Sequence, residues 1–483
     1  MTKYDLPKWV EKYKEKGKSI KIKNGKYYLY QVETIYDKNR PHNHLVKNIY
    51  IGSITEENGL IQKKKKNNIN PKDLYSKVYG PYLLFKKIGN NILERLIRHF
   101  GEEYGKYIYV ISILRSIENT PYCELEDAFQ ENYYSDIYKN LSMSKSSLSN
   151  FLKELSKYKT NMNEFMKEDI ENDDILIFDG TNILCGGNRI SYTGYGYQHG
   201  HNYTSQINEL YAYSVKNRKP IYYKLLEGSI SDKATLQDVL KEAGIKKSIS
   251  LIDKGFNSES NITSLLENKN KYIMAIRSDS KLVTTEILED TNREQAKEIF
   301  TLNGEAITAY ETLDDNNDRI CIYFNSTIAG VMDAEYIDKM NKQVKGFEKE
   351  NYVKSKKKFG IYIIKSNIND LTLKTIYEYY KSRFEIEYMF DTMKNTLNFD
   401  KSYMQSDESI ESWAFINHIS ILLTQKVYDL LKEKELKISL HQLYRKLRQV
   451  KVIKDVLDKE EKYELQGIPK KTRDLLENLD IVL

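Results

Sequence analysis

The most informative segment of the chain reads Ile376-Tyr-Glu-Tyr-Tyr-Lys-Ser-Arg-Phe-Glu-Ile-Glu-Tyr-Met-Phe-Asp-Thr-Met-Lys-Asn-Thr-Leu397. It contains no Gly or Pro, so we predict one helix of several turns. At about 100° per residue, a stripe roughly 60° wide gathers two cations, a carboxylate and a phenol, namely Tyr380, Arg383, Glu387 and Lys394. An apolar face lies beside it, made of Ile376, Tyr379, Phe390, Met393 and Leu397. The stripe is either a helix edge laced with ion pairs or a site whose charges meet phosphate groups.

Length and composition indicate a multi-domain globular chain. The 483 residues suggest two to four domains, and a hydrophobic content of 40% is enough to form cores. The net charge of +6 excludes a polycation, so local clusters of charge matter more than the total. The 40 tyrosines reflect an AT-rich coding genome as readily as a function.

The cysteines and the apolar runs bear on the compartment. Cys123, Cys185 and Cys321 lack the spacing of a metal site or of a disulfide framework. The N-terminus has no apolar signal-peptide core, and no run approaches about 18 apolar residues. We therefore expect a cytoplasmic protein without a membrane span, associated with the nucleoid when it binds DNA.

Two apolar runs end in an aspartate followed by turn residues. They read Ile175-Leu-Ile-Phe-Asp179-Gly and Ser248-Ile-Ser-Leu-Ile-Asp253-Lys-Gly-Phe. Each is predicted to be a buried strand that presents its acid at the end. With the candidates between and after them, residues 175–276 follow the order β-β-β-α-β-α-β, which indicates an α/β fold with a mixed sheet and flanking helices.

Asp179, Asp253 and Glu387 come from three segments that this topology can bring together. Two like charges ~4 Å apart repel by roughly 4 kcal/mol at an effective dielectric of 20, so such a cluster needs a divalent cation. Oxygen-only ligands favour Mg²⁺ or Mn²⁺ over zinc. A pair of such ions can activate a water or a 3′-hydroxyl and stabilise the leaving oxyanion at phosphorus. Arg383 and Lys394 would then meet phosphates of the substrate.

In the N-terminal region the hydrophobic pattern changes from the alternation typical of strands to the spacing typical of helices. Short strands are predicted at 25–32 and 47–52. The run Lys63–Lys66 is either a solvated loop or a phosphate contact. From Pro81 onward apolar residues recur at helical spacing. Within that helical part, residues 141–155 match a turn followed by the second helix of a helix-turn-helix, whose Ser and Lys residues could face DNA phosphates.

The predicted domain organisation follows from these changes and from a charged, strand-rich interruption before Phe359. The regions are a small Lys-rich β unit with possible DNA contact (1–80), a helical, DNA-binding region (81–170), the first part of the catalytic core (171–280), a β-rich insertion (281–358), the second part of the core (359–400) and a helical C-terminal region with a possible role in dimerisation (401–483).

Tyr380, Arg383, Glu387 and Lys394 have the spacing Y-x2-R-x3-E-x6-K. This spacing resembles the YREK signature of DDE transposases of the insertion-sequence-four superfamily. The motifs around Asp179 and Asp253 look like the first and second acid motifs of the same group. The resemblance runs from about residue 174 to residue 398.

The resemblance implies an RNase H-like catalytic core with an inserted β subdomain. It implies a DNA transposase that binds terminal inverted repeats, cleaves DNA with divalent metal and transfers a 3′-OH into target DNA. It also implies a homodimer in the synaptic complex. In these terms Asp179, Asp253 and Glu387 are catalytic and bind the metal, while transposon-end DNA is contacted by Tyr380, Arg383 and Lys394.

Several other residues compete for a role. Asp391 also falls on the stripe, and only the signature spacing selects Glu387 instead. Glu385 points away from the stripe. His199 and His201 are either a zinc pair or, as we favour, part of a loop or a DNA contact. Asp232 is expected to cap the next helix.

Two further functions stay open on the sequence. One is a nuclease of the same fold that hydrolyses DNA without strand transfer. The other is a domesticated or inactive DNA-binding protein, against which the presence of all three acids and of the signature cations counts.

Overall fold

The computed structural model describes residues 6–36, 44–62, 74–187, 189–198, 201–229, 235–277, 296–455 and 463–483. The chain divides into two compact units. The first comprises Met1–Leu74 with Asp455–Glu461, and the second comprises Tyr75–Lys454 with Lys462–Leu483.

The first unit is a four-stranded antiparallel sheet in the order β1-β2-β3-β4, with one short helix. Its core is small, formed by Val10, Leu29 and Ile54, with Trp9 packed edge-on against Tyr27. Both predicted strands are confirmed within β2 and β3, and the run Lys63–Lys66 lies outside the described residues. The elements are α1 (Lys8–Glu11), β1 (Lys18–Lys23), β2 (Lys26–Tyr36), β3 (His44–Thr55) and β4 (Gly59–Gln62).

From Gly80 to Lys167 the second unit is mostly helical, as the apolar spacing predicts. The longest of them, α3, bends at Gly101, whose φ of 79° is left-handed. It packs along α15 (Asp407–Glu433), and the two backbones approach closely enough for Ser112 and Ser420 to bond across them. The helices are α2 (Gly80–Ile88), α3 (Asn90–Glu118), α4 (Leu125–Glu131), α5 (Tyr134–Ile137), α6 (Lys145–Leu155) and α7 (Lys159–Lys167).

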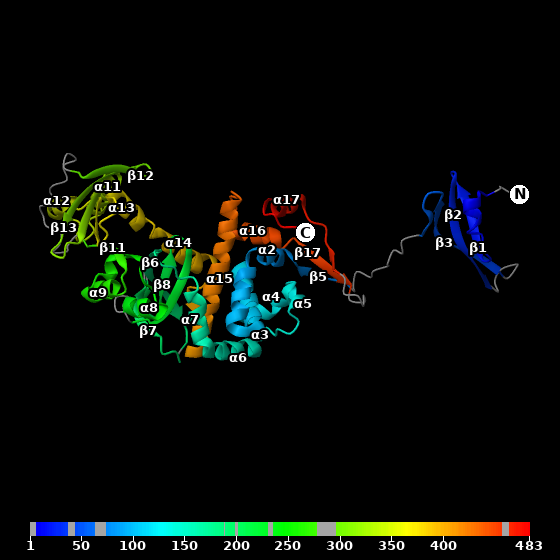
Figure 1. Cartoon of the computed structure of the whole chain (residues 1–483), viewed down its shortest axis with the longest axis horizontal. Helices are drawn as coiled ribbons and strands as arrows, with labels where there is room; N and C mark the ends of the chain where they lie inside the picture. The colour runs from blue at the N-terminus through cyan, green and yellow to red at the C-terminus, as the bar shows by residue number, and fades with distance from the viewer. Residues whose placement is uncertain are drawn as a thin grey trace. The chain divides into compact units, whose positions relative to one another are not determined.

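A mixed sheet forms the part of this unit that lies on the other side of α15 from α2 and α4 (Figure 1). The predicted order of elements is confirmed, with β7 as an additional strand. Around β6 the sheet runs β9-β8-β6-β10-β11: β6 is antiparallel to β8 and parallel to β10, and β10 is parallel to β11. The elements are β6 (Ile175–Cys185), β7 (Gly194–Gln198), β8 (His201–Ser214), β9 (Lys219–Glu227), α8 (Leu236–Ala243), β10 (Ile249–Ile252), α9 (Glu259–Glu267) and β11 (Lys271–Ala275).

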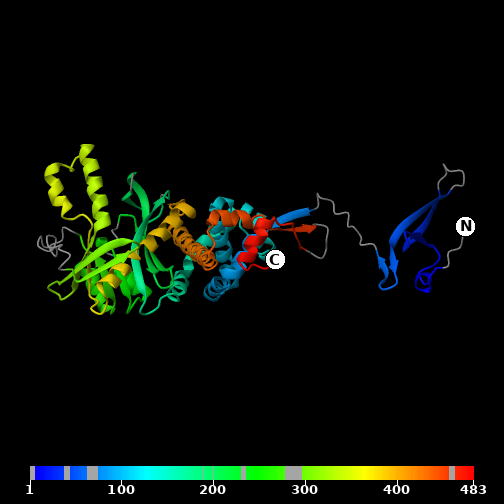
Figure 2. The same cartoon turned by 90° about the horizontal axis from the view of Figure 1, so that it is seen from above.

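The segment predicted as a β-rich insertion extends this same sheet. Beyond β11 the sheet continues with β15, which belongs to the predicted second part of the core, and then with the strands of the insertion in the order β14-β13-β12, so the hydrogen bonds run on without a break. The helices of the insertion form the yellow-green hairpin that stands away from the strands in Figure 2. The elements are β12 (Glu298–Leu302), β13 (Glu305–Leu313), β14 (Arg319–Asn325), α11 (Ser326–Asn341), α12 (Lys349–Lys356) and β15 (Ile361–Ser366).

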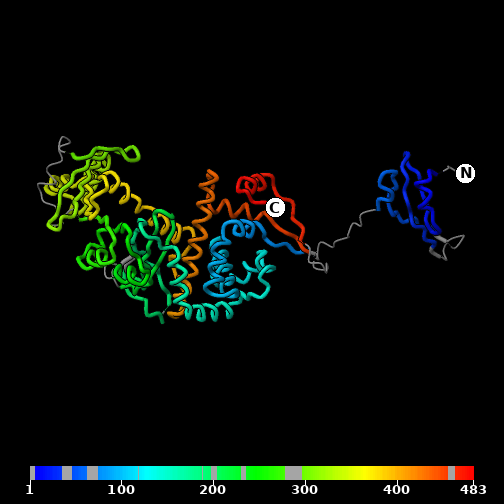
Figure 3. The backbone as a smooth tube through the Cα atoms, viewed as in Figure 1, coloured from blue at the N-terminus to red at the C-terminus, as the bar shows by residue number. Residues whose placement is uncertain are grey.

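The C-terminal part is helical but also contributes strands. β17 (Lys451–Asp455) pairs with β18 (Tyr463–Leu465) and with β5 (Leu74–Val78), so segments far apart in sequence lie side by side, as Figure 3 shows. The other elements after β15 are α13 (Leu373–Lys381), α14 (Phe384–Asp391), β16 (Lys401–Ser402), α16 (Leu440–Leu447) and α17 (Lys470–Asn478).

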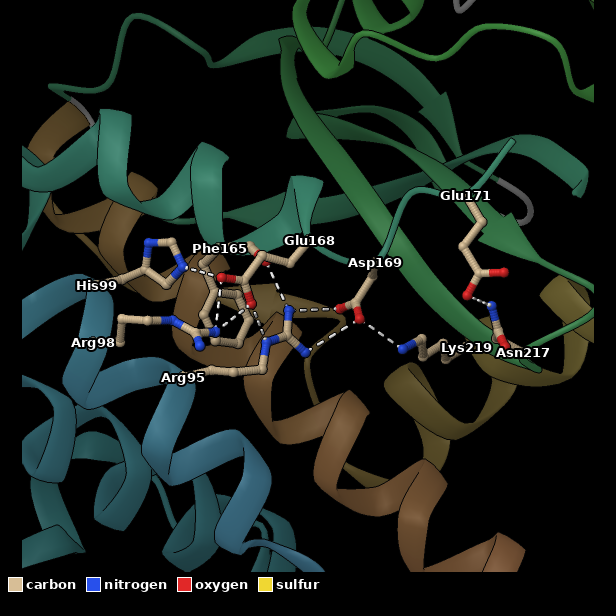
Figure 4. A network of polar contacts seen from close by, with 9 residues as sticks. All are labelled: Arg95, Arg98, His99, Phe165, Glu168, Asp169, Glu171, Asn217 and Lys219. Carbon is tan, nitrogen blue, oxygen red and sulfur yellow. Dashed lines mark hydrogen bonds and ion pairs between the residues drawn. The ribbon is translucent and has the colours of Figure 1, made fainter. Parts of the chain in front are cut away.

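A polar network ties the helical part to the sheet (Figure 4). Arg95 on α3 bonds Glu168 at 2.8 Å and Asp169 at 2.9 Å, just after α7. Lys219, the first residue of β9, bonds the other oxygen of Asp169 at 2.7 Å. Because Asp169 is buried between the two cations, this network fixes α3 against the sheet edge.

Candidate active site

The two aspartates lie next to each other because β6 and β10 are parallel and in register. Phe178 is paired with Ile252, so the residues that follow, Asp179 and Asp253, occupy the same row. The prediction that Asp179 ends its strand is wrong, since β6 continues to Cys185. The part of β6 beyond Asp179 stays paired with β8, whereas β10 stops at Ile252. The two aspartates therefore lie where β10 ends.

The predicted single helix is interrupted. It consists of α13, a tight turn at Ser382–Arg383, α14 and a π-helical turn over Thr392–Thr396. At the first break the backbone bonds span three residues, from Arg383 N to Tyr380 O at 3.2 Å. The apolar face is nevertheless as expected, because Ile376, Met393 and Leu397 are buried. Interruptions of this kind re-aim side chains and recur at functional sites.

Arg383 is the centre of the site. Its Nη1 lies 3.1 Å from Asp253 Oδ1, and its Nη2 lies 3.3 Å from Asp179 Oδ2 and 3.9 Å from Glu387 Oε1. Nη1 also lies 3.4 Å from the hydroxyl of Tyr380. One guanidinium thus contacts all three predicted carboxylates and the predicted phenol, which come from three segments of the chain.

Burial and charge oppose each other at this cluster. Burial raises the pKa of Asp179, and the Arg383 guanidinium offsets only part of that rise. For Arg383, burial lowers the pKa, but Asp253 and Asp179 outweigh it and the net shift is upward. Burial also raises the pKa of Tyr380. The guanidinium therefore stays charged and neutralises the carboxylates around it.

Lys394 takes a different position from the other signature residues. It lies in the π-helical turn and is half-buried, and burial lowers its pKa while Asp400 and Glu209 oppose that shift. The charges that act on the pKa of Lys394 are those of Asp400 and Glu209, and not those of Asp179 or Asp253. Glu387, in contrast, is the most open member of the site, with 63% of its side chain exposed.

A basic hollow adjoins Asp253 and Tyr380. It has a volume of about 530 Å³, and its lining includes Lys254, Arg277 and Lys358. We did not assign these three cations from the sequence. Lys254 directly follows Asp253, and Lys358 belongs to a lysine cluster, so the local sequence could have indicated both of them as phosphate contacts. Arg277 comes from the end of β11, and only the sheet order brings it here.

Glu209 on β8 is a further acid that sequence reasoning missed. It is 1% exposed. Among the described residues, no hydrogen bond of good geometry reaches either of its carboxylate oxygens. Its neighbour on β6 is Thr181, two residues beyond Asp179 on the same face of the sheet. Burial raises its pKa to about 8. The sequence did carry a sign of this acid, because Glu209 alternates along β8 with buried positions that are otherwise apolar, such as Ile207 and Tyr211.

The carboxylates fit a divalent cation in chemistry but not in their present spacing. Their ligand atoms are all oxygens, the donors that Mg²⁺ and Mn²⁺ prefer. Within the described parts of the chain, no group of three His, Cys, Asp or Glu side chains is placed to hold a metal ion. The positive charge that the three acids share here is that of Arg383.

The competing residues lie elsewhere or outside the described set. Asp391 is exposed and accepts a bond from Asn395 at 2.6 Å. Glu385 lies 3.5 Å from the hydroxyl of Tyr213. His199, Asp232 and the side chain of His201 fall outside the described residues.

A family model described as "Transposase DDE domain" matches residues 171–423, just over half of the chain. The chain belongs to the transposase DDE domain family. The matched range contains both aspartate strands and the interrupted helix, so it spans every residue of the cluster around Arg383. Transposases of this family act on DNA and generally use divalent metal ions.

This DDE transposase is similar to the cryo-EM structure of a piggyBac transposase synaptic complex with hairpin DNA. The identity is 13%, the match covers 83% of this chain and 85% of that one, and the TM-score is 0.40. No curated protein matches the chain significantly. Among the described residues, no helix is long and apolar enough to cross a membrane.

Proposed function

We propose that this protein is the transposase of an insertion sequence in the insertion-sequence-four superfamily. It would bind the element's terminal inverted repeats, cleave DNA there and join the freed 3′-OH to target DNA. The observation that carries the proposal is the convergence of Asp179, Asp253 and Glu387 on one cation, Arg383. These acids lie up to 208 positions apart in the sequence, and their grouping within a DDE-family domain is what such chemistry requires.

The proposed fold of the catalytic core is RNase H-like. The strand order β9-β8-β6-β10-β11, with both aspartates on neighbouring parallel strands, supports it. We propose that the strands β12–β14 and their helices are the family's insertion, although they continue the sheet. Residues before 170 would hold the end of the DNA, and the active form would be a homodimer in a synaptic complex.

The proposed roles of the residues follow from their charge and position. Asp179, Asp253 and Glu387 would hold Mg²⁺ or Mn²⁺, which supplies activation of the attacking hydroxyl and stabilisation of the leaving oxyanion when it is bound. Arg383 would bind a phosphate through its planar fork, and the Tyr380 hydroxyl would orient it. Lys394 would add a positive point charge near the same DNA strand. The basic hollow next to Asp253 would accept the phosphate backbone.

A joining assay tests the proposal. The protein is mixed with Mg²⁺, a supercoiled target and DNA ends that carry the inverted repeats flanking the gene. We expect strand cleavage followed by joining, and we expect Asp179→Asn, Asp253→Asn and Glu387→Gln to abolish both. Glu385→Gln is the matched control on the same helix, because this acid contacts Tyr213 and not Arg383.

The alternative functions give different results in this assay. A protein that cleaves the ends but never joins them is a nuclease, and the transposase proposal then fails. A protein that binds the ends without cleaving them is a DNA-binding protein. If the three acid variants still join DNA, the assignment of the active site is wrong.

A further inference from the structure

We propose that a second groove, formed by α6 and by the segments before α15 and after β6, binds the DNA duplex away from its cleaved end. This inference rests on the proposed function, because it extends the path of the same DNA. The groove has a volume of about 780 Å³. Figure 1 shows α6 crossing near the first turns of α15, and the two helices are in contact.

The charge of the groove is of one sign. Its described lining residues include the cations Lys145, Lys153 and Arg189 and no carboxylate. All three cations are exposed, and none forms an ion pair with a carboxylate within the described part of the chain. Glu408 acts electrostatically on Lys153 but does not line the groove. Cations without an ion pair around a hollow complement a polyanion.

The sequence of α6 places these groups on one face. Lys145, Ser149 and Lys153 are spaced four residues apart, so they form a single outward stripe. The adjacent face, with Leu148, Phe151, Leu152 and Leu155, is buried, and the helix backbone is held to α15 by the bond from Ser412 Oγ to Leu152 O at 2.6 Å. The stripe therefore cannot rotate inward, and its two ammonium groups and its hydroxyl suit successive phosphates.

An aromatic side chain completes the groove. Tyr403 is 76% exposed, although it follows a buried residue, Ser402, in β16. Exposure of a tyrosine to this extent leaves its ring available to pack against sugars or bases. Gln405 is also exposed there, and Ser149 supplies a hydroxyl. Such a mixture of cations, amides and hydroxyls is typical of surfaces that contact a DNA backbone.

The sheet fixes the distance between the groove and the active site. Within β6 the chain runs from Asp179 to the end of the strand at Cys185, and the Gly186 N–H then donates to Ser402 O at 2.9 Å, beside Tyr403. Six residues of extended strand span about 20 Å. That length equals about six base pairs at ~3.4 Å each. We therefore infer that DNA whose cleaved phosphate lies at Arg383 meets this groove about six base pairs further inside the end.

The first test is a salt titration of DNA binding. The probe is a fluorescein-labelled duplex with the terminal repeat from the gene's flank, followed by anisotropy. Combining Lys145→Ala, Lys153→Ala and Arg189→Ala should weaken binding and lower the slope of log K against log salt by up to about 0.9 for each cation removed. The control combines Lys241→Ala, Lys246→Ala and Lys432→Ala, which removes the same charge from exposed sites outside the groove.

The second test locates the DNA and uses a thiol already in the chain. Cys123 lines the groove and is exposed, whereas Cys185 and Cys321 are buried. A duplex with a thiol tether about six base pairs from the cleaved end should form a disulfide with Cys123, and Cys123→Ser should abolish it. Tethers at the far end of the duplex should not react.

The outcomes separate this inference from the proposed function. If the unmodified protein cleaves its ends while the groove variants bind with an unchanged slope and Cys123 does not cross-link, the groove is not a DNA site. If the protein neither cleaves nor binds the ends, the proposed function itself fails. Because all substituted side chains are exposed, thermal unfolding of the variants should match that of the original protein.

Discussion

At the scale of single residues, Arg383 decides the character of the site. Three carboxylates close together are unfavourable without a cation, and the guanidinium supplies one through three contacts of 3.1–3.9 Å. The same side chain has the geometry to bind a phosphate. Its two tasks compete, so its substitution should change both the stability and the response to metal.

We expect Arg383→Ala to be less stable than the original protein by about 2 kcal/mol without metal, because the acids lose their cation. Mg²⁺ or Mn²⁺ should then raise the melting temperature of this variant more than that of the original protein, since no guanidinium competes with the ion. Thermal unfolding with and without each metal measures both effects. Arg383→Lys, which keeps a positive charge, is the control. Equal metal shifts in all three proteins would contradict the expectation.

Glu209 gives a pH-dependent prediction. Burial raises its pKa in the folded protein to about 8, whereas the unfolded chain has an ordinary carboxyl. Between these two pKa values the unfolded state binds fewer protons, so the free energy of unfolding falls as the pH rises. Glu209→Gln should remove this loss, and its advantage should grow from pH 5 to pH 8 to on the order of 3 kcal/mol. Urea unfolding at both pH values checks it. A constant difference across this range would contradict it.

At the scale of elements, the interrupted helix and the polar network position the site. The tight turn at Ser382–Arg383 and the π-helical turn at Thr392–Thr396 change the directions of side chains that an unbroken helix would align. Arg383 consequently contacts both aspartates, whereas the charges that act on the pKa of Lys394 are those of Asp400 and Glu209. The sheet that carries Asp179 is in turn fixed to α3 by Asp169.

We expect Asp169→Asn to lower the free energy of unfolding by about 3 kcal/mol, because Arg95 and Lys219 lose a buried partner. Burial alone would raise the pKa of Asp169, but Arg95 and Lys219 outweigh it and the pKa is lowered. The original protein should therefore lose the same stabilisation as the pH falls through that lowered value. Denaturant unfolding measures the difference. The exposed pair of Lys216 and Glu171 is the control, for which Lys216→Ala should leave the free energy of unfolding nearly unchanged, because solvent screens an exposed ion pair.

At the scale of the whole molecule, the chain has two units with separate cores. The first unit is built on Val10, Leu29 and Ile54, and none of these belongs to the large core of the second unit. The second unit contains every residue of the candidate active site and of the proposed groove. The candidate active site and the proposed groove therefore lie within one compact unit.

A variant that lacks residues 1–73 should keep the unfolding temperature of the second unit, because it retains β5 and the whole of the large core. Calorimetry should show the remaining transition unchanged and the contribution of the small sheet lost. The same variant tests which N-terminal segment contacts DNA, since the groove on α6 is intact. A large drop in the unfolding temperature of the second unit would show that the two cores are not independent.

The sequence alone determined the features that depend on local spacing. Alternation and apolar runs predicted the strands of Asp179 and Asp253. The acid motifs and the signature spacing around Glu387 indicated a DDE transposase, and the match over 171–423 established the transposase DDE domain family. These signals are readable because a strand or a helix repeats with a fixed period along the chain. The same periodicity predicted an unbroken helix and an Asp179 at the end of its strand, and both predictions were wrong.

Only the tertiary structure decided how those pieces meet. The guanidinium of Arg383 lies between three acids because β6 and β10 are in register and the helix breaks just before it. Glu209, Arg277 and the groove at Tyr403 acquire their surroundings from strands and loops distant in sequence. No local period encodes such contacts, because packing between segments, and not the conformation within a segment, determines which side chains share a surface.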